Sequence, residues 1–129
     1  MTRTGFVLVK FDEEFPDYYM CKSCRTHIAL ADDLDSFDAG AELSGAMFRR
    51  AVNIKVDHPD HYREVAGCTV ADIYCVKCNN RLGWQYVLVN GSHIPDRYYE
   101  HVRLKMKKLV RKYSTEILDA ETMSPVRED

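Results

Sequence analysis

The chain of 129 residues has no long hydrophobic run. Near its N-terminus the only continuous apolar stretch is Phe6–Val9, which is too short for the core of a secretory signal peptide. No stretch approaches the roughly 20 apolar residues that a transmembrane helix needs. We therefore expect a protein of the cytoplasm, the nucleus or both, with no membrane partner.

Net charge is also nearly absent. The 18 basic and 20 acidic residues give a formal charge of −2, and the pI is about 6.2. Because domains that bind nucleic acid are usually basic overall, the total charge gives no reason to expect such a partner. The hydrophobic share of 46% and the charged share of 29% are ordinary for a globular protein, which excludes wholesale disorder. The length indicates one domain.

Cysteines are few and odd in number, which fits an extracellular disulfide framework poorly. Four of the five form two Cys-x-x-Cys pairs, Cys21 with Cys24 and Cys75 with Cys78. Two cysteines at this spacing share one tight turn and direct both sulfur atoms to one ion. Two pairs therefore supply the closed tetrahedral shell of a structural Zn²⁺. We expect one such ion, with no coordination position open for catalysis.

The fifty residues between the pairs exceed the roughly 15–20 of an ordinary zinc ribbon, so the metal would join the two ends of a domain core. The alternative is a thioredoxin-like redox pair, but that motif occurs once, at a helix N-terminus after a strand. The fifth cysteine, Cys68, is either a small buried residue or a reactive thiol, and nothing nearby in the sequence is arranged to activate it. His27 is expected to form hydrogen bonds behind the metal ligands.

Patterns typical of β-strands run through most of the chain. Alternation of apolar residues predicts a strand over 48–56, and further apolar runs predict strands over 5–11, 69–75 and 82–89. The acidic segment 31–46 is expected to be a loop. Over 98–113 the apolar residues fit both periods, and we expect a strand to about Met106 and a short helix after it.

Four motifs follow one another between residues 18 and 90. They are Tyr19-x-Cys-x-x-Cys-Arg-x-His27, Phe48-x-x-x-Val-Asn53, Val70-Ala-Asp-Ile-Tyr-Cys-x-x-Cys78 and Leu82-Gly-Trp-x-Tyr86. In order and spacing they resemble the yippee (yippee-like) family. The resemblance implies a mainly β fold of two antiparallel sheets pinned by a zinc site of four cysteines. This β-tent is shared with the thalidomide-binding domain of cereblon, methionine sulfoxide reductase B and centromere-licensing relatives.

The resemblance also implies that the four paired cysteines, Cys21, Cys24, Cys75 and Cys78, are the metal ligands. Members of the family have no settled enzymatic activity, and one branch associates with a GID/CTLH-type ubiquitin ligase. On this basis we expect an N-terminal strand and acidic turn over 1–17, a yippee-like zinc domain over 18–113 and a polar C-terminal tail over 114–129.

Trp84 and Tyr86 are expected on one face of the strand 82–89, together with the leucines of that strand. They are either core residues or the wall of a partner groove. In the cereblon-type relative, aromatic residues at these positions belong to a cage, but the two tryptophans that complete it are replaced here by Glu64 and Val70. We therefore expect a shallow groove for a peptide or protein surface, which requires Trp84 to be partly solvent-accessible.

The leading hypothesis is a zinc-stabilised protein-interaction module without enzymatic activity, working in a larger assembly such as a GID/CTLH-type ubiquitin ligase. One alternative is an enzyme like methionine sulfoxide reductase, but its nucleophilic cysteine lies on a late strand and no cysteine here follows Cys78. The other is a nucleic-acid-binding zinc protein, which only the six basic residues of 103–112 support. These residues form either a solvated face or a docking site for an acidic partner or for phosphates.

Overall fold

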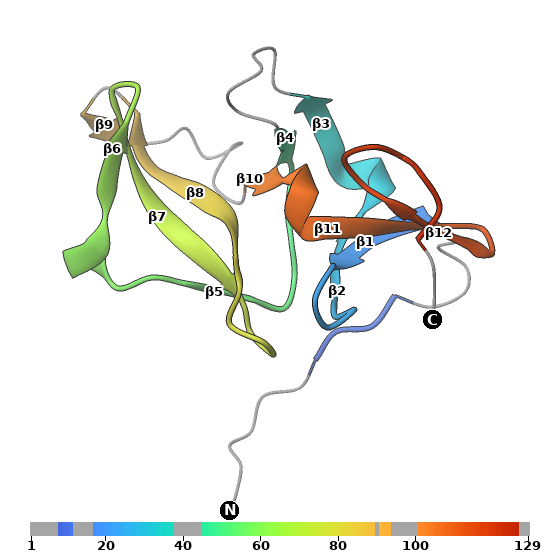
Figure 1. The fold of residues 1–129 in the computed structure, drawn as a ribbon. Coiled ribbons are helices and arrows are strands. Elements are labelled where there is room, and N and C mark those ends of the chain that lie inside the picture. The colour runs from blue at the N-terminus through green and yellow to red at the C-terminus, as the bar shows by residue number, and fades with distance from the viewer. Residues whose placement is uncertain (1–7, 12–16, 38–44, 90, 94–100, 127–129) are drawn as a thin grey trace, which may run out of the picture.

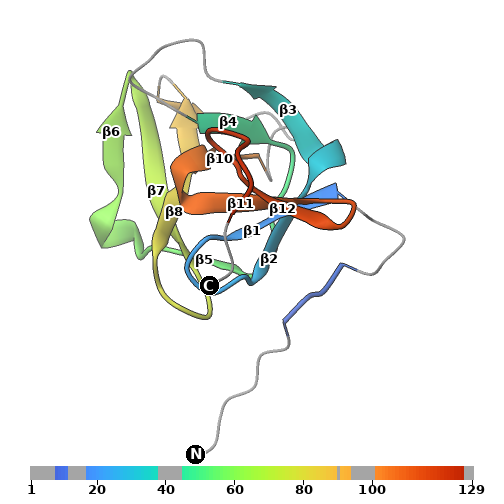
Figure 2. The same ribbon diagram turned by 45° about the vertical axis from the view of Figure 1, so that its right-hand side comes forward.

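A computed structural model describes residues 8–11, 17–37, 45–89, 91–93 and 101–126, which form two antiparallel sheets (Figures 1 and 2). Helical structure in these ranges is limited to 3-10 turns at Ala31–Asp33, Pro59–His61 and Met106–Lys108. The expected mainly β fold of two antiparallel sheets is therefore confirmed. The predicted N-terminal strand is wrong for residues 8–11, which are not in a strand. Residues 5–7 and the acidic turn 12–16 lie outside the described residues.

The smaller sheet has four strands in the order β12-β11-β1-β2. They are β1 (Asp17–Cys21), β2 (His27–Leu30), β11 (Leu109–Tyr113) and β12 (Glu116–Asp119). The larger sheet has the order β3-β4-β10-β8-β7-β5, with β6 also paired to β7 and β9 to β8. Its strands are β3 (Leu34–Phe37), β4 (Gly45–Phe48), β5 (Ile54–Val56), β6 (Arg63–Val65), β7 (Cys68–Cys75), β8 (Arg81–Val89), β9 (Ser92–His93) and β10 (Val102–Lys105).

The expected short C-terminal helix is wrong. The predicted strand before it is present as β10, but after the 3-10 turn Met106–Lys108 the chain continues as β11. Leu109 and Val110 are both fully buried, in two different apolar clusters. A strand that buries consecutive residues on both faces loses the period-2 pattern, and its apolar residues then imitate a helical face.

Within the expected polar C-terminal tail 114–129, the described residues 114–126 pack on the smaller sheet. Its residues Glu116–Asp119 form β12, which pairs with β11, and Leu118 is buried. The chain then returns along this strand, because Val126 N donates to Ile117 O at 2.9 Å. The domain therefore extends beyond the boundary at residue 113.

The single strand expected over 48–56 is split. β4 ends at Phe48 and β5 begins at Ile54, while Asn53 takes a left-handed conformation with φ 58° that strands do not use. The loop expected over 31–46 is wrong for its described residues, since 31–37 form a 3-10 turn and β3 and 45–46 begin β4, while 38–44 lie outside the described residues. The strands predicted over 69–75 and 82–89 are confirmed as β7 and β8.

One core lies between the two sheets. Tyr19, Ile28 and Leu109 of the smaller sheet belong to the same buried cluster as Ile73 and Leu104 of the larger sheet. Tyr19 lies against Phe48 across this gap with ring centroids 5.2 Å apart, and both rings are buried. Burial of each such side chain contributes about 1.5–3 kcal/mol to folding, so this cluster holds the sheets together.

Register shifts between β7 and β8 decide which residues of β8 face that core. The pairing shifts between Ile73 and Tyr74, so Leu82 enters the core cluster while Trp84, opposite Asp72, points to the other face of the sheet. A second shift, between Thr69 and Val70, has the same effect at the end of β8, so Leu88 points to the face opposite Tyr86. The expectation that the leucines of this strand share a face with Trp84 and Tyr86 is therefore wrong.

Candidate metal centre

Each sheet supplies one cysteine turn. Cys21 is the last residue of β1, and the chain turns through Cys24 into β2. Cys75 is the last residue of β7, and the chain turns through Cys78 into β8. A metal bound to both turns therefore links the two sheets, as the sequence predicted.

The two turns have the same hydrogen-bonding pattern. In the first, Cys21 O accepts from Arg25 N and Cys21 N donates to Thr26 O, both at 2.8 Å. The second repeats these contacts at 2.9 Å with Cys75, Asn79 and Asn80. Arg25 and Asn79 follow the second cysteine of each pair and have φ of 63° and 67°. This left-handed step bends the chain back and brings the two sulfur atoms of a pair to one side.

The four sulfur atoms all lie within 4.8 Å of one another. Cys21 Sγ is 3.6 Å from Cys78 Sγ, and Cys24 Sγ is 3.5 Å from Cys75 Sγ. A tetrahedral site with metal–sulfur bonds of about 2.3 Å has sulfur–sulfur edges of about 3.8 Å. The cluster therefore has the size of a four-cysteine metal site, and none of the five cysteines is in a disulfide.

Burial opposes thiolate formation in this cluster. It raises the pKa of the Cys21 thiol to about 12 and raises the pKa of the Cys75 thiol as well. Burial also acts to raise the pKa of Cys24, but hydrogen bonds, first that of the Thr26 hydroxyl, outweigh it and lower the pKa to about 7. Metal ligation requires deprotonated thiols, so a bound dication must supply the free energy that ionises them. Four thiols that converge on one point can bind such a dication together.

Side chains that the sequence did not single out support the sulfur atoms. Thr26 Oγ1 lies 3.0 Å from Cys24 Sγ, and Asn80 Nδ2 donates to Cys78 Sγ at 3.4 Å. Asn80 Nδ2 also donates to Ser23 Oγ of the other turn at 2.6 Å, so it connects the two cysteine turns. Such contacts orient metal ligands. The sequence carried one signal for them, since the Asn79-Asn80 pair directly after Cys78 is typical of a turn.

Asn53 connects the cysteine turns from outside. Its backbone oxygen accepts from Val76 N, inside the second turn, at 3.0 Å. Its Nδ2 donates to His27 O, just after the first turn, at 2.7 Å, and to Val9 O at 2.8 Å. Its role could not be predicted, because its partners lie far away in the sequence.

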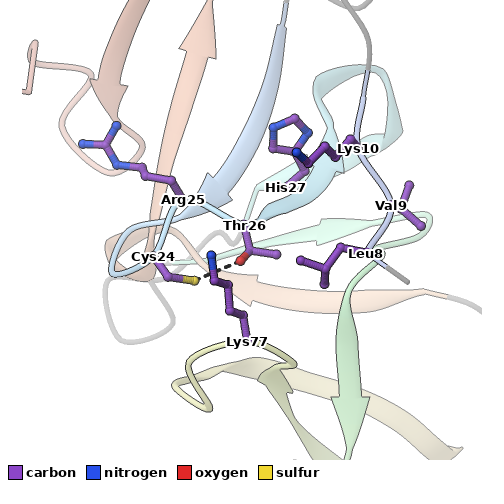
Figure 3. Close-up of a pocket in the computed structure, with 8 residues that line it drawn as sticks. All are labelled: Leu8, Val9, Lys10, Cys24, Arg25, Thr26, His27 and Lys77. Carbon is purple, nitrogen blue, oxygen red and sulfur yellow. Dashed lines mark hydrogen bonds between the residues drawn. The ribbon is translucent and has the colours of Figure 1, made fainter. Parts of the chain in front are cut away.

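The basic residues near the cysteines differ in their partners and orientation. Lys22 forms an ion pair of 2.8 Å with Asp119, and Arg81 forms one of 3.0 Å with Asp72. In Figure 3 the ammonium group of Lys77 points toward Cys24, whereas the guanidinium of Arg25 points away from it. Of these two residues, Lys77 is the one oriented to offset the charge of a metal held by four thiolates.

A cavity of about 220 Å³ opens beside Cys24. Its walls come from the first cysteine turn, the second turn and residues 8–10 (Figure 3). His27 lines it too, but its Nδ1 accepts from Phe11 N at 2.9 Å, so the hydrogen bond that the structure gives this ring is to the N-terminal segment and not to a cysteine. Cys68 lies at the start of β7, outside the sulfur cluster, and is half-buried.

Trp84 is 8% exposed, so the expectation of a partly accessible tryptophan is wrong. The guanidinium of Arg63 lies over its ring, 5.8 Å from the centroid, and the indole Nε1 has no hydrogen-bond acceptor among the described residues. Tyr86 is half-buried, and its hydroxyl accepts from Arg103 Nε at 3.1 Å. Burial raises the pKa of this hydroxyl, and the adjacent indole lowers it in part, although the two groups do not reach hydrogen-bond geometry. Arg63 thus covers the indole of Trp84, and Arg103 binds the hydroxyl of Tyr86.

Comparison with known proteins agrees with this architecture. A family model described as "Yippee zinc-binding/DNA-binding /Mis18, centromere assembly" matches residues 18–121. A protein yippee-like from Arabidopsis thaliana is 41% identical over 70 residues, which are 53% of this chain and 54% of that relative. A second one from the same plant is 35% identical over 98 residues, 74% of this chain and 91% of the relative. The chain thus spans about half the length of the first relative and most of the second.

Among solved structures, the crystal structure of the Mis18 "Yippee-like" domain superimposes with a TM-score of 0.58. The match covers 74% of this chain and 94% of that chain at 18% identity, so it shows a shared fold and no more. The family match is the stronger finding, because the stretch 18–121 contains both cysteine turns and nearly all of both sheets. With this match the chain belongs to the Yippee–Mis18 family.

Proposed function

We propose that the protein is a zinc-stabilised protein-interaction module with no catalytic activity of its own. The observation that carries the proposal is the convergence of four sulfur atoms from two cysteine turns, one on each sheet. A closed shell of four protein ligands has no position for a substrate, so the metal serves the fold. The relatives described above also bear no enzyme names.

Zinc is the ion that suits this site best. Thiolate ligands select soft or borderline metals, and a tetrahedral set of four cysteines is typical of zinc. The name of the family model, which contains the words zinc-binding, supports the same ion. Bound zinc would be held by Cys21, Cys24, Cys75 and Cys78 and would keep them ionised.

The setting that we infer is the cytoplasm or the nucleus, where thiols stay reduced and available to a metal. No helix among the described residues is long and apolar enough to cross a membrane. Resemblance to the yippee family extends the proposal to a subunit or regulator of a GID/CTLH-type ubiquitin ligase. The family description also contains the words DNA-binding, but nucleic acid is the weaker candidate, because two cations of the basic stretch, Arg111 and Lys112, already make contacts within the protein.

The proposal is tested by combining metal analysis with covalent cross-linking in cells. We expect about one zinc per chain, together with a reproducible set of cross-linked proteins that is lost when Cys75→Ser abolishes metal binding. Cys68→Ser is the matched control and should keep both the metal and the partners. A zinc-loaded, folded domain that cross-links to no protein would contradict the proposal, and so would partner capture that persists in a metal-free Cys75→Ser protein.

A further inference from the structure

The structure divides the basic stretch 103–112 into two groups. Arg111 forms two hydrogen bonds to Asp17, of 2.6 and 2.7 Å, and Lys112 lies over the ring of Tyr18. Both belong to the smaller sheet and hold its strands together. Arg103 and Lys105 instead lie on β10, which runs between β4 and β8 of the larger sheet (Figure 1).

Strand register places the β10 cations on the outer face of the larger sheet. Arg103 is paired with Trp84, and Trp84 with Asp72, whereas the neighbouring Leu104 belongs to the core cluster. Cross-strand partners point to the same side of a sheet, and residues two apart in a strand do so as well. Arg103 and Lys105 therefore share the face of Asp72, away from the core.

Two further arginines reach this face from distant parts of the sequence. Arg63 of β6 binds Asp72 with both Nε and an Nη, at 3.1 and 2.7 Å, and Arg81 of β8 binds the same carboxylate at 3.0 Å. The side chains of Arg63 and Arg81 are 39% and 34% exposed. One carboxylate balances only one of the two guanidinium charges, so positive charge remains at the surface.

Lys105 lies in the same positive field. Burial lowers the pKa of its ammonium group, and the charges of Arg81, Lys107, Lys108 and Arg63 lower it further. Lys107 is exposed on the 3-10 turn that follows β10. We call this surface the basic face and define it by Arg63 and Arg81, which bind Asp72, by Lys105 of β10 and by Lys107 on the turn directly after β10.

We propose that the basic face binds a short acidic segment of a partner protein. Its cations come from three strands and one turn, and they concentrate positive charge in a chain whose net charge is −2. A short acidic peptide ends within this patch, whereas a long nucleic acid would extend over the acidic remainder of the molecule. Exposed guanidinium and ammonium groups both suit carboxylates. The inference rests on the proposed interaction function and names its partner class.

Fluorescence anisotropy of the zinc-loaded full chain with a labelled peptide of alternating glutamate and serine tests this. The variant Lys105→Gln/Lys107→Gln leaves the ion pairs of Asp72 intact and should weaken binding about fivefold or more. Lys10→Gln/Arg50→Gln removes the same amount of charge outside the basic face, at exposed side chains, and should change the affinity less than about twofold. Binding should also weaken when salt rises from about 50 to 300 mM.

Equal losses in the two variants, or tighter binding of a labelled single-stranded oligonucleotide than of the peptide, would overturn the acidic-segment proposal. Cellular cross-linking separates this result from the function itself. If partners persist in Lys105→Gln/Lys107→Gln, the interaction module stands and the basic face is not its docking site. If the wild-type domain captures no partner, the interaction function itself fails.

Discussion

The carboxamide of Asn53 holds both backbone groups of Val9, with Oδ1 accepting from Val9 N and Nδ2 donating to Val9 O, each at 2.8 Å. The same residue binds the chain next to both cysteine turns, through His27 O and Val76 N. Asn53 therefore joins three segments that are remote in sequence, two through its side chain and one through its backbone oxygen. It does so from a left-handed backbone conformation, which asparagine tolerates better than most residues.

Asn53→Ala should lower the free energy of unfolding of the zinc-loaded domain by about 2–4 kcal/mol. The change removes three side-chain hydrogen bonds, each worth about 0.5–1.5 kcal/mol, and leaves alanine in an unfavourable backbone conformation. Urea denaturation at a fixed zinc concentration measures the difference. Asn53→Gly is the matched control, because it removes the same hydrogen bonds without the backbone strain and should cost less. A loss below about 0.5 kcal/mol in Asn53→Ala would contradict this account.

Replacement of one cysteine in the cluster should remove the metal and unfold the domain. Structural zinc contributes about 10–16 kcal/mol in small zinc-finger peptides, which exceeds the stability of most single domains. Metal analysis of Cys75→Ser should find no stoichiometric zinc, and its circular dichroism should lose the native signal. Cys68→Ser should retain both, because Cys68 lies outside the sulfur cluster. Zinc retained in Cys75→Ser, or lost in Cys68→Ser, would show that the ligands are wrongly assigned.

The contact between His27 and Phe11 predicts a dependence of stability on pH. The neutral ring of His27 accepts from Phe11 N, and burial, together with the charges of Lys10 and Lys112, lowers the pKa of His27 below its usual 6.5. A group with a lowered folded-state pKa contributes stability that is fully present above the unfolded pKa and is lost as the pH falls through the folded pKa. The N-terminal segment should therefore detach on acidification below about pH 6.5.

Unfolding free energies measured between about pH 7.5 and pH 5 should fall more steeply for the wild type than for His27→Gln. The glutamine oxygen can accept from Phe11 N at every pH, and protonation of the cysteines affects both proteins alike. Parallel curves would mean that His27 does not act through this hydrogen bond. Titration of the ring by NMR should in addition give a pKa below the usual value.

The cysteine cluster could be predicted from the sequence because its information is local. The two residues between paired cysteines fix a tight turn, and one long-range contact between the two turns is enough to form the cluster. The sequence of β8 contains no local pattern that predicts its bulges. Without the register shift beside Ile73, Leu82 and Trp84 would share a face, as strict alternation predicts. The sequence did not predict β11 for a related reason, since Leu109 and Val110 are buried on opposite sides and hide the period of the strand.

Trp84 provides the last prediction, because its burial changes what its substitution should do. The side chain is 8% exposed beneath Arg63, so Trp84→Ala should leave a cavity and cost about 3–5 kcal/mol of stability. Tyr86→Phe is the control on the same strand. It removes only the hydroxyl that accepts from Arg103 and should cost about 0.5–1.5 kcal/mol. Thermal denaturation of the zinc-loaded proteins ranks the two variants. If Trp84→Ala instead has the melting temperature of the wild type but no longer captures partners, this indole is a docking residue. It would then become exposed only when a partner binds.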